Sequence, residues 1–116
     1  MILQQVGALL TGIGADVKLG FLPDKPDTVI ALFEYQGEPP QHSFGHTDDI
    51  HNIQARTRAL STVQAYELAE LVAERLHRYS DSDISVLRSS AILDIGHDDA
   101  NPQRKEYTVN FTVRRL

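Results

Sequence analysis

Residues 52–60 alternate between small or apolar side chains and polar ones, which is typical of a strand with one buried face. The side that we predict to be buried carries Ile53, Ala55, Thr57 and Ala59. The other side is rich in hydrogen-bond donors and carries Asn52, Gln54, Arg56 and Arg58. A strand that buries one face needs a cover, and the run from about Thr62 to Arg78 has apolar residues at helical spacing. We therefore predict a strand–helix unit to which the other elements are added.

The same kind of pattern predicts three more strands and one more helix. Residues 2–13 place their apolar side chains on one helical stripe and end in glycines. Residues 28–35 are apolar on both faces, so this strand is either central or covered on its second face by a partner. Residues 84–95 form an apolar run with a bend or bulge near Arg88. Residues 107–114 show the clearest alternation in the chain.

Two connecting segments lack a periodic pattern. Residues 15–27 contain two prolines and two turn-favouring aspartates, so we predict a connector there. Residues 36–49 form the longest unpatterned stretch, and Pro39 and Pro40 exclude regular strand pairing within it. A loop of this length in a compact domain is usually functional or mobile. Its aromatic residue, Phe44, either folds back onto the core or is presented to a partner.

These elements predict an α+β fold in the order α-β-β-α-β-β. We expect an antiparallel or mixed four-stranded sheet with two helices packed on one face. The whole chain, 1–116, is expected to form a single domain, because 116 residues are enough for one modest core and not for two. The face of the sheet that the helices leave uncovered carries Gln54, Arg56, Arg58, Thr108, Asn110 and Thr112.

Composition narrows the classes of function. The net charge of −5 disfavours nonspecific binding to nucleic acid, which needs an excess of Lys and Arg. The absence of cysteine excludes disulfides, thiolate chemistry and Cys-based zinc sites. The apolar runs are much shorter than the about 20 residues of a membrane span, so no membrane partner is expected. The N-terminal residues lack a basic segment, so we expect no signal peptide.

One cluster has the residue types of a metal site: His42, His46 and His51, with Asp48 and Asp49 between them. Its spacing matches no closed metal site, and a solvated polar loop is the favoured interpretation. The pairs Asp48-Asp49 and Asp98-Asp99 are typical of turns. The sequence also lacks a phosphate-binding loop and a nucleophile elbow. We therefore expect no enzyme, cofactor or metal, with a small metal-dependent enzyme as the alternative.

Arg56 and Arg58 are more informative, because they project from the same side of one predicted strand. Guanidinium groups bind the carboxylates of a neighbouring chain or the phosphates of a nucleic acid. Given the net charge of −5, a protein partner is favoured over nucleic acid. An ordinary solvated sheet face is the competing interpretation.

Several runs resemble a family of small tailed-bacteriophage proteins, the minor capsid or tail terminator (tail completion) proteins. These runs are Leu22-Pro23-Asp24-x-Pro26-Asp27, Leu32-Phe33-Glu34-Tyr35-Gln36-Gly37-Glu38-Pro39-Pro40, Ile53-Gln54-Ala55-Arg56-Thr57-Arg58, and Ala65-Tyr66 with Leu68-Ala69. The similarity extends from about residue 17 through the second predicted helix. The run Glu-Tyr-x-Gly-Glu-Pro-Pro is its best single marker.

The resemblance implies a structural virion protein that is assembled in the host cytoplasm. Its subunits would form a ring, often a hexamer, that caps the tail tube, stops tube growth and docks to the head connector. DNA would pass through the lumen without specific binding, and the family has no catalytic motif to transfer. We predict that Gln54, Arg56 and Arg58 form the subunit interface, and that the 36–49 loop, with Glu38 and Phe44, reaches the tube or the connector. A small adaptor module without a ring is the alternative.

Overall fold

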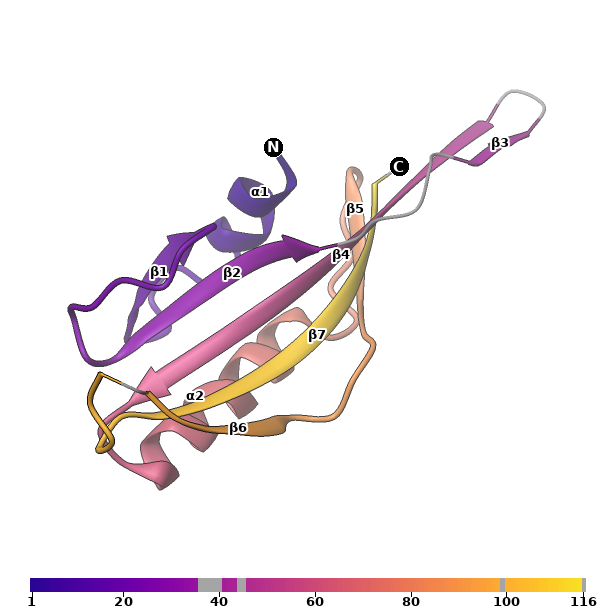
Figure 1. Cartoon of the computed structure of the whole chain (residues 1–116). Helices are drawn as coiled ribbons and strands as arrows, with labels where there is room; N and C mark the ends of the chain where they lie inside the picture. Colours follow the sequence, from indigo (N-terminus) through magenta and orange to yellow (C-terminus); the bar gives the residue numbers. More distant parts are fainter. Residues whose placement is uncertain (36–40, 44–45, 99, 116) are drawn as a thin grey trace.

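The structure is a computed structural model that describes residues 1–35, 41–43, 46–98 and 100–115, with the backbone alone for 41–43 and 46–48. Its described elements follow one another along the chain as shown in Figure 1. They are α1 (Ile2–Ala8), β1 (Asp16–Leu19), β2 (Val29–Tyr35), β3 (Gln41–Ser43), β4 (His46–Ala59), α2 (Thr62–Leu76), β5 (Ile84–Arg88), β6 (Leu93–His97) and β7 (Lys105–Arg115). No helix in the described part of the chain is long and apolar enough to cross a membrane.

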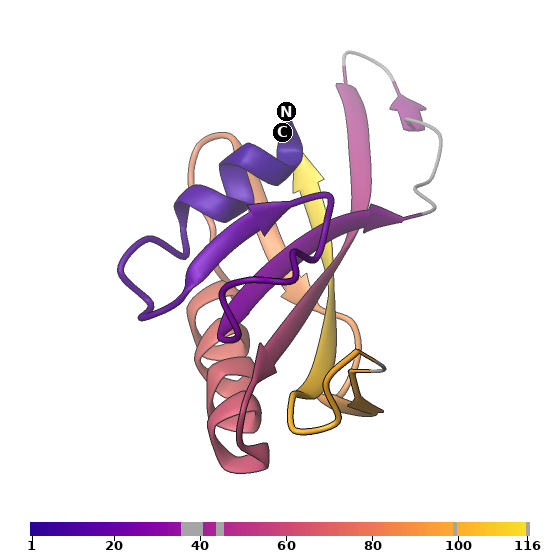
Figure 2. The same cartoon turned by 60° about the vertical axis from the view of Figure 1, so that its left-hand side comes forward.

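The described strands form one mixed sheet in the order β1-β2-β4-β7-β5, and β6 also pairs with β7. The β1–β2 pair is parallel, and the other pairs in this sheet are antiparallel. Both helices lie on the same side of the sheet, with α1 against β1 and β2 and α2 against β4 and β7 (Figures 1 and 2). The predicted α+β class is therefore confirmed, but the predicted four strands are wrong. Six strands form the main sheet, and the short β3 pairs with the outer end of β4.

Two of the additional strands arise from β1 and from the division of 84–95 into β5 and β6, and in neither segment does alternation of apolar and polar residues indicate the observed strands. Strand β1 lies in the predicted connector, and its four residues include the polar Asp16 and Lys18. The run 84–95 does not form one bent strand, because β5 and β6 pair with successive parts of the eleven-residue β7. At the corner between them, the Ser89 amide donates to the Asn110 carbonyl (2.8 Å) and the Asn110 amide donates to Ser90 Oγ (2.9 Å).

Strand β3 is the third addition, and it lies in the predicted loop 36–49. Its residues pair with His46–Asp48, so β3 and the start of β4 form a ribbon of two strands. This ribbon extends beyond the rest of the sheet at the upper right of Figure 1. Residues 36–40 and 44–45 of the predicted loop, including Pro39 and Pro40, lie outside the described residues.

The helices differ from their predicted lengths mainly at their ends. Helix α1 ends at Ala8 instead of continuing to residue 13, although Leu10 and Ile13 remain buried in the turns that follow. Helix α2 begins as predicted, because Ser61 Oγ accepts a hydrogen bond from the Gln64 amide (3.0 Å). It ends two residues before the predicted Arg78, which adopts a positive φ of 66°.

The core lies between the two helices and the sheet. The predicted buried positions of β4 are all buried, and so are the apolar positions of β7, which are Tyr107, Val109, Phe111 and Val113. They pack together with residues of α1, α2 and β2. The alternation of apolar and polar residues therefore identifies the side of the central strands that the helices cover.

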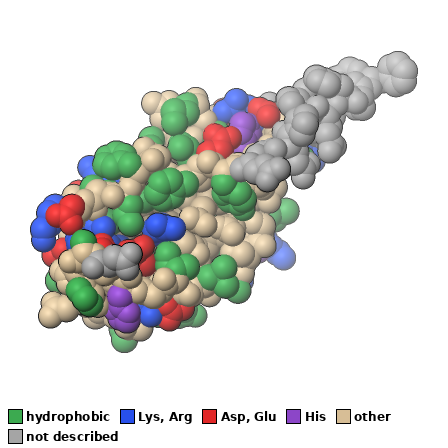
Figure 3. All heavy atoms as spheres, viewed as in Figure 1, with side chains coloured by type: hydrophobic (Ala, Val, Ile, Leu, Met, Phe, Trp, Pro, Cys, Tyr) green, Lys and Arg blue, Asp and Glu red, His purple; other side chains and the backbone are tan. Residues whose placement is uncertain are grey.

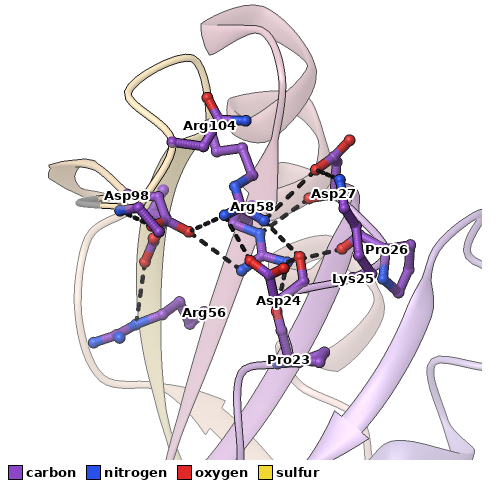
Figure 4. Close-up of polar contacts among 12 residues, drawn as sticks. Pro23, Asp24, Lys25, Pro26, Asp27, Arg56, Arg58, Asp98 and Arg104 are labelled. Carbon is purple, nitrogen blue, oxygen red and sulfur yellow. Dashed lines mark hydrogen bonds and ion pairs between the residues drawn. The ribbon is translucent and has the colours of Figure 1, made fainter.

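On the side of the sheet opposite the helices, the segment Leu22–Asp27 covers one end of the sheet. Two arginines hold this segment in place (Figure 4). Arg58 is 1% exposed. Its Nη2 donates to the carbonyl oxygens of Pro23 (2.6 Å), Asp24 (3.2 Å) and Pro26 (2.8 Å), and its Nε donates to that of Asp27 (3.1 Å). These contacts give the buried guanidinium the partners that it loses from water.

Arg104 holds the same segment from the loop that precedes β7. Its Nη1 donates to the Asp24 carbonyl (2.5 Å) and its Nη2 donates to the Asp24 carboxylate (3.0 Å). This hydrogen bond and the guanidinium charge lower the pKa of Asp24. Asp98 lies between the two arginines, 3.5 Å from Arg58 Nη1 and 3.2 Å from Arg104 Nη2. We call this group, Arg58 and Arg104 with Asp24, Asp98 and the Leu22–Asp27 segment, the arginine clamp.

We predict that Phe111→Ala lowers the free energy of unfolding by about 3–5 kcal/mol, because it removes a fully buried aromatic ring from the centre of β7. Chemical denaturation measures this loss. The control is Phe21→Ala, which truncates a ring that is largely exposed and should change stability by about 0.5 kcal/mol or less. A loss of under about 1 kcal/mol for Phe111→Ala would show that the C-terminal strand is misplaced.

We also predict that Arg58→Met lowers the free energy of unfolding by about 2–4 kcal/mol, because several carbonyl oxygens of the Leu22–Asp27 segment lose their donor. Hydrogen exchange should become faster in residues 20–28. Arg78→Met removes an exposed arginine and serves as the control. Equal stability of the two variants would contradict the clamp.

Candidate functional site

The side of the sheet opposite the helices is the candidate functional surface, and we call it the open face. In Figure 1, β4 and β7 pass in front of α2, so Figure 3 shows this side. Strand pairing places four residues of β4 beside four of β7: Asn52 with Thr112, Gln54 with Asn110, Arg56 with Thr108, and Arg58 with Glu106. The open face therefore carries all six of the polar residues predicted for it.

Apolar side chains flank this polar strip on both sides. On β2, the register places Phe33 beside Gln54 and Tyr35 beside Asn52. On the other side, Leu87 of β5 pairs with Thr112 and Leu93 of β6 pairs with Thr108. Tyr35, Leu87, Leu93 and the neighbouring Ile95 are between 41% and 56% exposed. Figure 3 shows hydrophobic side chains distributed among polar ones over this face, with charged groups gathered at its ends.

Arg56 lies where the polar strip meets the β2 side of the face. Its guanidinium carbon is 5.8 Å from the centroid of the Phe33 ring, and its Nε is 3.8 Å from Glu106 Oε1. Burial raises the pKa of Glu106, and the charge of Arg56 opposes this rise. The Arg56 side chain is 34% exposed. It is therefore positioned by its own subunit and still accessible to a partner.

A hollow of about 630 Å³ lies between Arg56 and the arginine clamp. Its walls include Leu22 and Ile95 on the apolar side and His97, Asp98 and Glu106 on the polar side. The hollow is wide and open, with charges of both signs. It is not the enclosed, mostly apolar pocket that is typical of a site for a small molecule.

The predicted interface residues have different environments. Gln54 and Arg56 are half-buried on the open face. Arg58 projects to the predicted side of β4, but the Leu22–Asp27 segment covers it. Its guanidinium therefore binds its own chain and is not available to a partner. The Arg58 side chain reaches the Leu22–Asp27 segment, whose position the alternation along β4 does not indicate. Glu38 and Phe44 lie outside the described residues.

Of the three histidines in the predicted cluster, the structure describes the side chain of His51 alone, which contacts carboxylates of its own subunit. His51 Nδ1 forms an ion pair with Glu34 and Nε2 lies 3.0 Å from Asp49 Oδ2, while Arg115 Nη1 lies 3.7 Å from the same oxygen. Burial lowers the pKa of His51, but the hydrogen bonds and charges of Glu34 and Asp49 give it a net increase. The described residues contain no group suited to hold a metal ion. The side chains of His42 and His46 are not among those described.

The exposed apolar residues of the open face are the part of the site that sequence reasoning missed. Because residues 28–35 are apolar on both faces, their pattern does not indicate which side is open, and the pairing with β4 places Phe33 and Tyr35 on the open face. The positions of Leu87, Leu93 and Ile95 follow from the division of 84–95 into two strands, for which the run itself carries no signal.

Comparisons with known proteins identify the family and the fold of this chain. A family model described as bacteriophage tail terminator protein matches residues 3–116. A comparison with curated proteins gave no match. Among solved structures, a chain from the virion of a native gene transfer agent particle aligns with a TM-score of 0.58 and 13% sequence identity, over 95% of this chain and 83% of that chain. At this identity, the structural similarity shows a shared fold.

The family match covers nearly the whole chain, so the predicted resemblance is confirmed and extends further in both directions than the runs that suggested it. Proteins of this family are structural components of the virion tail and are not enzymes, which removes the metal-dependent enzyme as an alternative. The chain belongs to the bacteriophage tail terminator protein family.

Proposed function

We propose that this protein assembles through its open face into a closed ring of identical subunits, with six as the expected number. The ring caps the tail tube, stops its growth and offers a surface to the head connector. The observation that carries this proposal is the exposed set of apolar side chains around the polar strip of the open face, in a chain that belongs to the tail terminator family. Apolar patches framed by polar residues are typical of protein interfaces.

The chemistry of the open face favours another protein chain as its partner. The face offers aromatic and aliphatic side chains together with the accessible Arg56, and these are the residue types enriched in the centres of interfaces. Nucleic acid is disfavoured, because the net charge of −5 repels phosphate. A ring with this charge would let DNA pass through its lumen without holding it.

The ribbon of β3 and the start of β4 is the second part of the proposal. Asp49–Ala59 of β4 pair with β7, whereas His46–Asp48 pair only with β3 among the described residues. A ribbon of two strands is marginally stable by itself, so contact with a neighbour would stabilise it. We propose that this ribbon, with Glu38 and Phe44, contacts the tube protein or the connector.

We expect the purified protein to form rings with a central hole in negative-stain electron microscopy, either alone or with tube protein added. Light scattering after size-exclusion chromatography should give a mass that is a multiple of the 13.0 kDa subunit. A protein that stays monomeric at high concentration, with and without tube protein, would contradict the ring. The alternative, a small adaptor module that forms no ring, would then be favoured.

We predict that Arg56→Glu disrupts assembly more than folding, because the side chain is accessible on the open face. Light scattering measures assembly and circular dichroism measures folding. Arg78→Glu makes the same change of charge at an exposed position after α2 and serves as the control. If Arg56→Glu unfolds the protein while its folded fraction assembles normally, Arg56 belongs to the fold and not to the interface.

A further inference from the structure

We infer that the open face of one subunit receives helix α2 of the next subunit. The contact surface on α2 consists of residues that point away from the sheet, and we call it the outer face of α2: Val63, Glu67, Glu70, Leu71 and Glu74. The inference rests on the proposed self-assembly and specifies the second surface that this assembly requires.

Geometry requires two different surfaces in such a ring. If two open faces packed on each other, the contact would be complete in a dimer and could not continue to a third subunit. A ring of more than two subunits needs a surface that binds the open face and is not the open face itself. The outer face of α2 lies on the opposite side of the same sheet, so each subunit can use both surfaces at once (Figure 2).

The outer face of α2 has the composition of a contact surface. Val63 is 65% exposed and Leu71 is 46% exposed, and with Glu67 they form one ridge at four-residue spacing. Glu67, Glu70, Leu71 and Glu74 lie together on the surface of the helix. None of these three glutamates takes part in the ion pairs found among the described residues. Exposed apolar residues among unpaired acids are unnecessary for the fold of the subunit, and a partner would cover them.

The dimensions of the two surfaces match. The apolar residues of β2 and those of β6 are separated by β4 and β7, which at about 4.8 Å per strand places them about 14 Å apart. A helix with its side chains is about 10–12 Å wide and fits between them. The contact residues of α2, from Val63 to Glu74, span about 18 Å, and the part of β4 that stays uncovered beside β2, from Asn52 to Arg56, spans about 17 Å.

The chemistry of the two surfaces is complementary as well. Along the polar strip, Arg56 supplies a positive charge, and the amides of Gln54 and Asn110 supply hydrogen-bond donors. The glutamates of α2 are acceptors for both. Leu71 and Val63 of the helix would meet the apolar side chains of β2 or of β5 and β6. Two open faces packed together would lack the glutamates of α2.

The test uses the full chain with Glu67→Lys and Leu71→Lys in one variant, which reverses the charge and removes the apolar contact at two exposed positions of α2. We expect light scattering to show self-association weakened by at least about tenfold relative to the wild type, with an unchanged circular dichroism spectrum. Asp83→Lys adds positive charge at an exposed position beyond the helix and should assemble as the wild type does. Val63→Lys tests the other end of the outer face and replaces the first variant if that variant does not fold.

Mixing variants separates this inference from the proposed function. The α2 variant keeps an intact open face, and Arg56→Glu keeps an intact α2, so an equimolar mixture should form dimers that do not grow into rings. An α2 variant that assembles normally while Arg56→Glu does not would overturn the role of α2 and leave the open face as the interface. Normal assembly of Arg56→Glu, or a wild-type protein that is always monomeric, would overturn both the role of α2 and the proposed assembly through the open face.

Discussion

Strand β4 determines the two sides of this molecule, because its alternating side chains face either the helices or the open surface. It lies between β2 and β7, and its register with both assigns their residues to the same two sides. A shift of one residue would move Ile53 and Ala55 out of the core and would place Arg56 beneath α2. Arg58 opposes such a shift, because its buried guanidinium is matched to the carbonyl oxygens of the Leu22–Asp27 segment.

The arginine clamp also limits where a partner can bind. It covers the end of the open face where β4 and β7 place Arg58 beside Glu106, so the Arg58 guanidinium is hydrogen-bonded within the subunit. The rest of the face keeps Gln54, Arg56 and the exposed apolar residues of β2, β5 and β6 at the surface. Two arginines two residues apart on one strand thus have different roles, and the segment that covers one of them makes the difference.

The parts of the fold that follow from short-range periodicity could be predicted from the sequence. These are the sides of β4 and β7, helix α2 with its Ser61 cap, and the α+β class. The parts that depend on contacts between distant segments could not. The burial of Arg58 depends on a proline-rich connector 31 to 35 residues earlier, and the division of 84–95 depends on the length of β7. For the candidate site, alternation identified Gln54 and Arg56, but only the strand pairing shows that Leu87 and Leu93 lie on the same face.

The edges of the sheet explain why association through faces is favoured over the addition of strands. At one edge, β1 has four residues, two of them charged. At the other edge, β5 and β6 have five residues each and are interrupted by the corner at residues 89–92. Short, charged and broken edges are the features that oppose pairing with the strand of another chain. The proposed contacts use faces instead of edges: the open face and the outer face of α2, which lie on opposite sides of the subunit. A protein with two unlike surfaces of this kind can add copies in one direction only, and the series closes into the proposed ring where the rotation at each step divides a full turn.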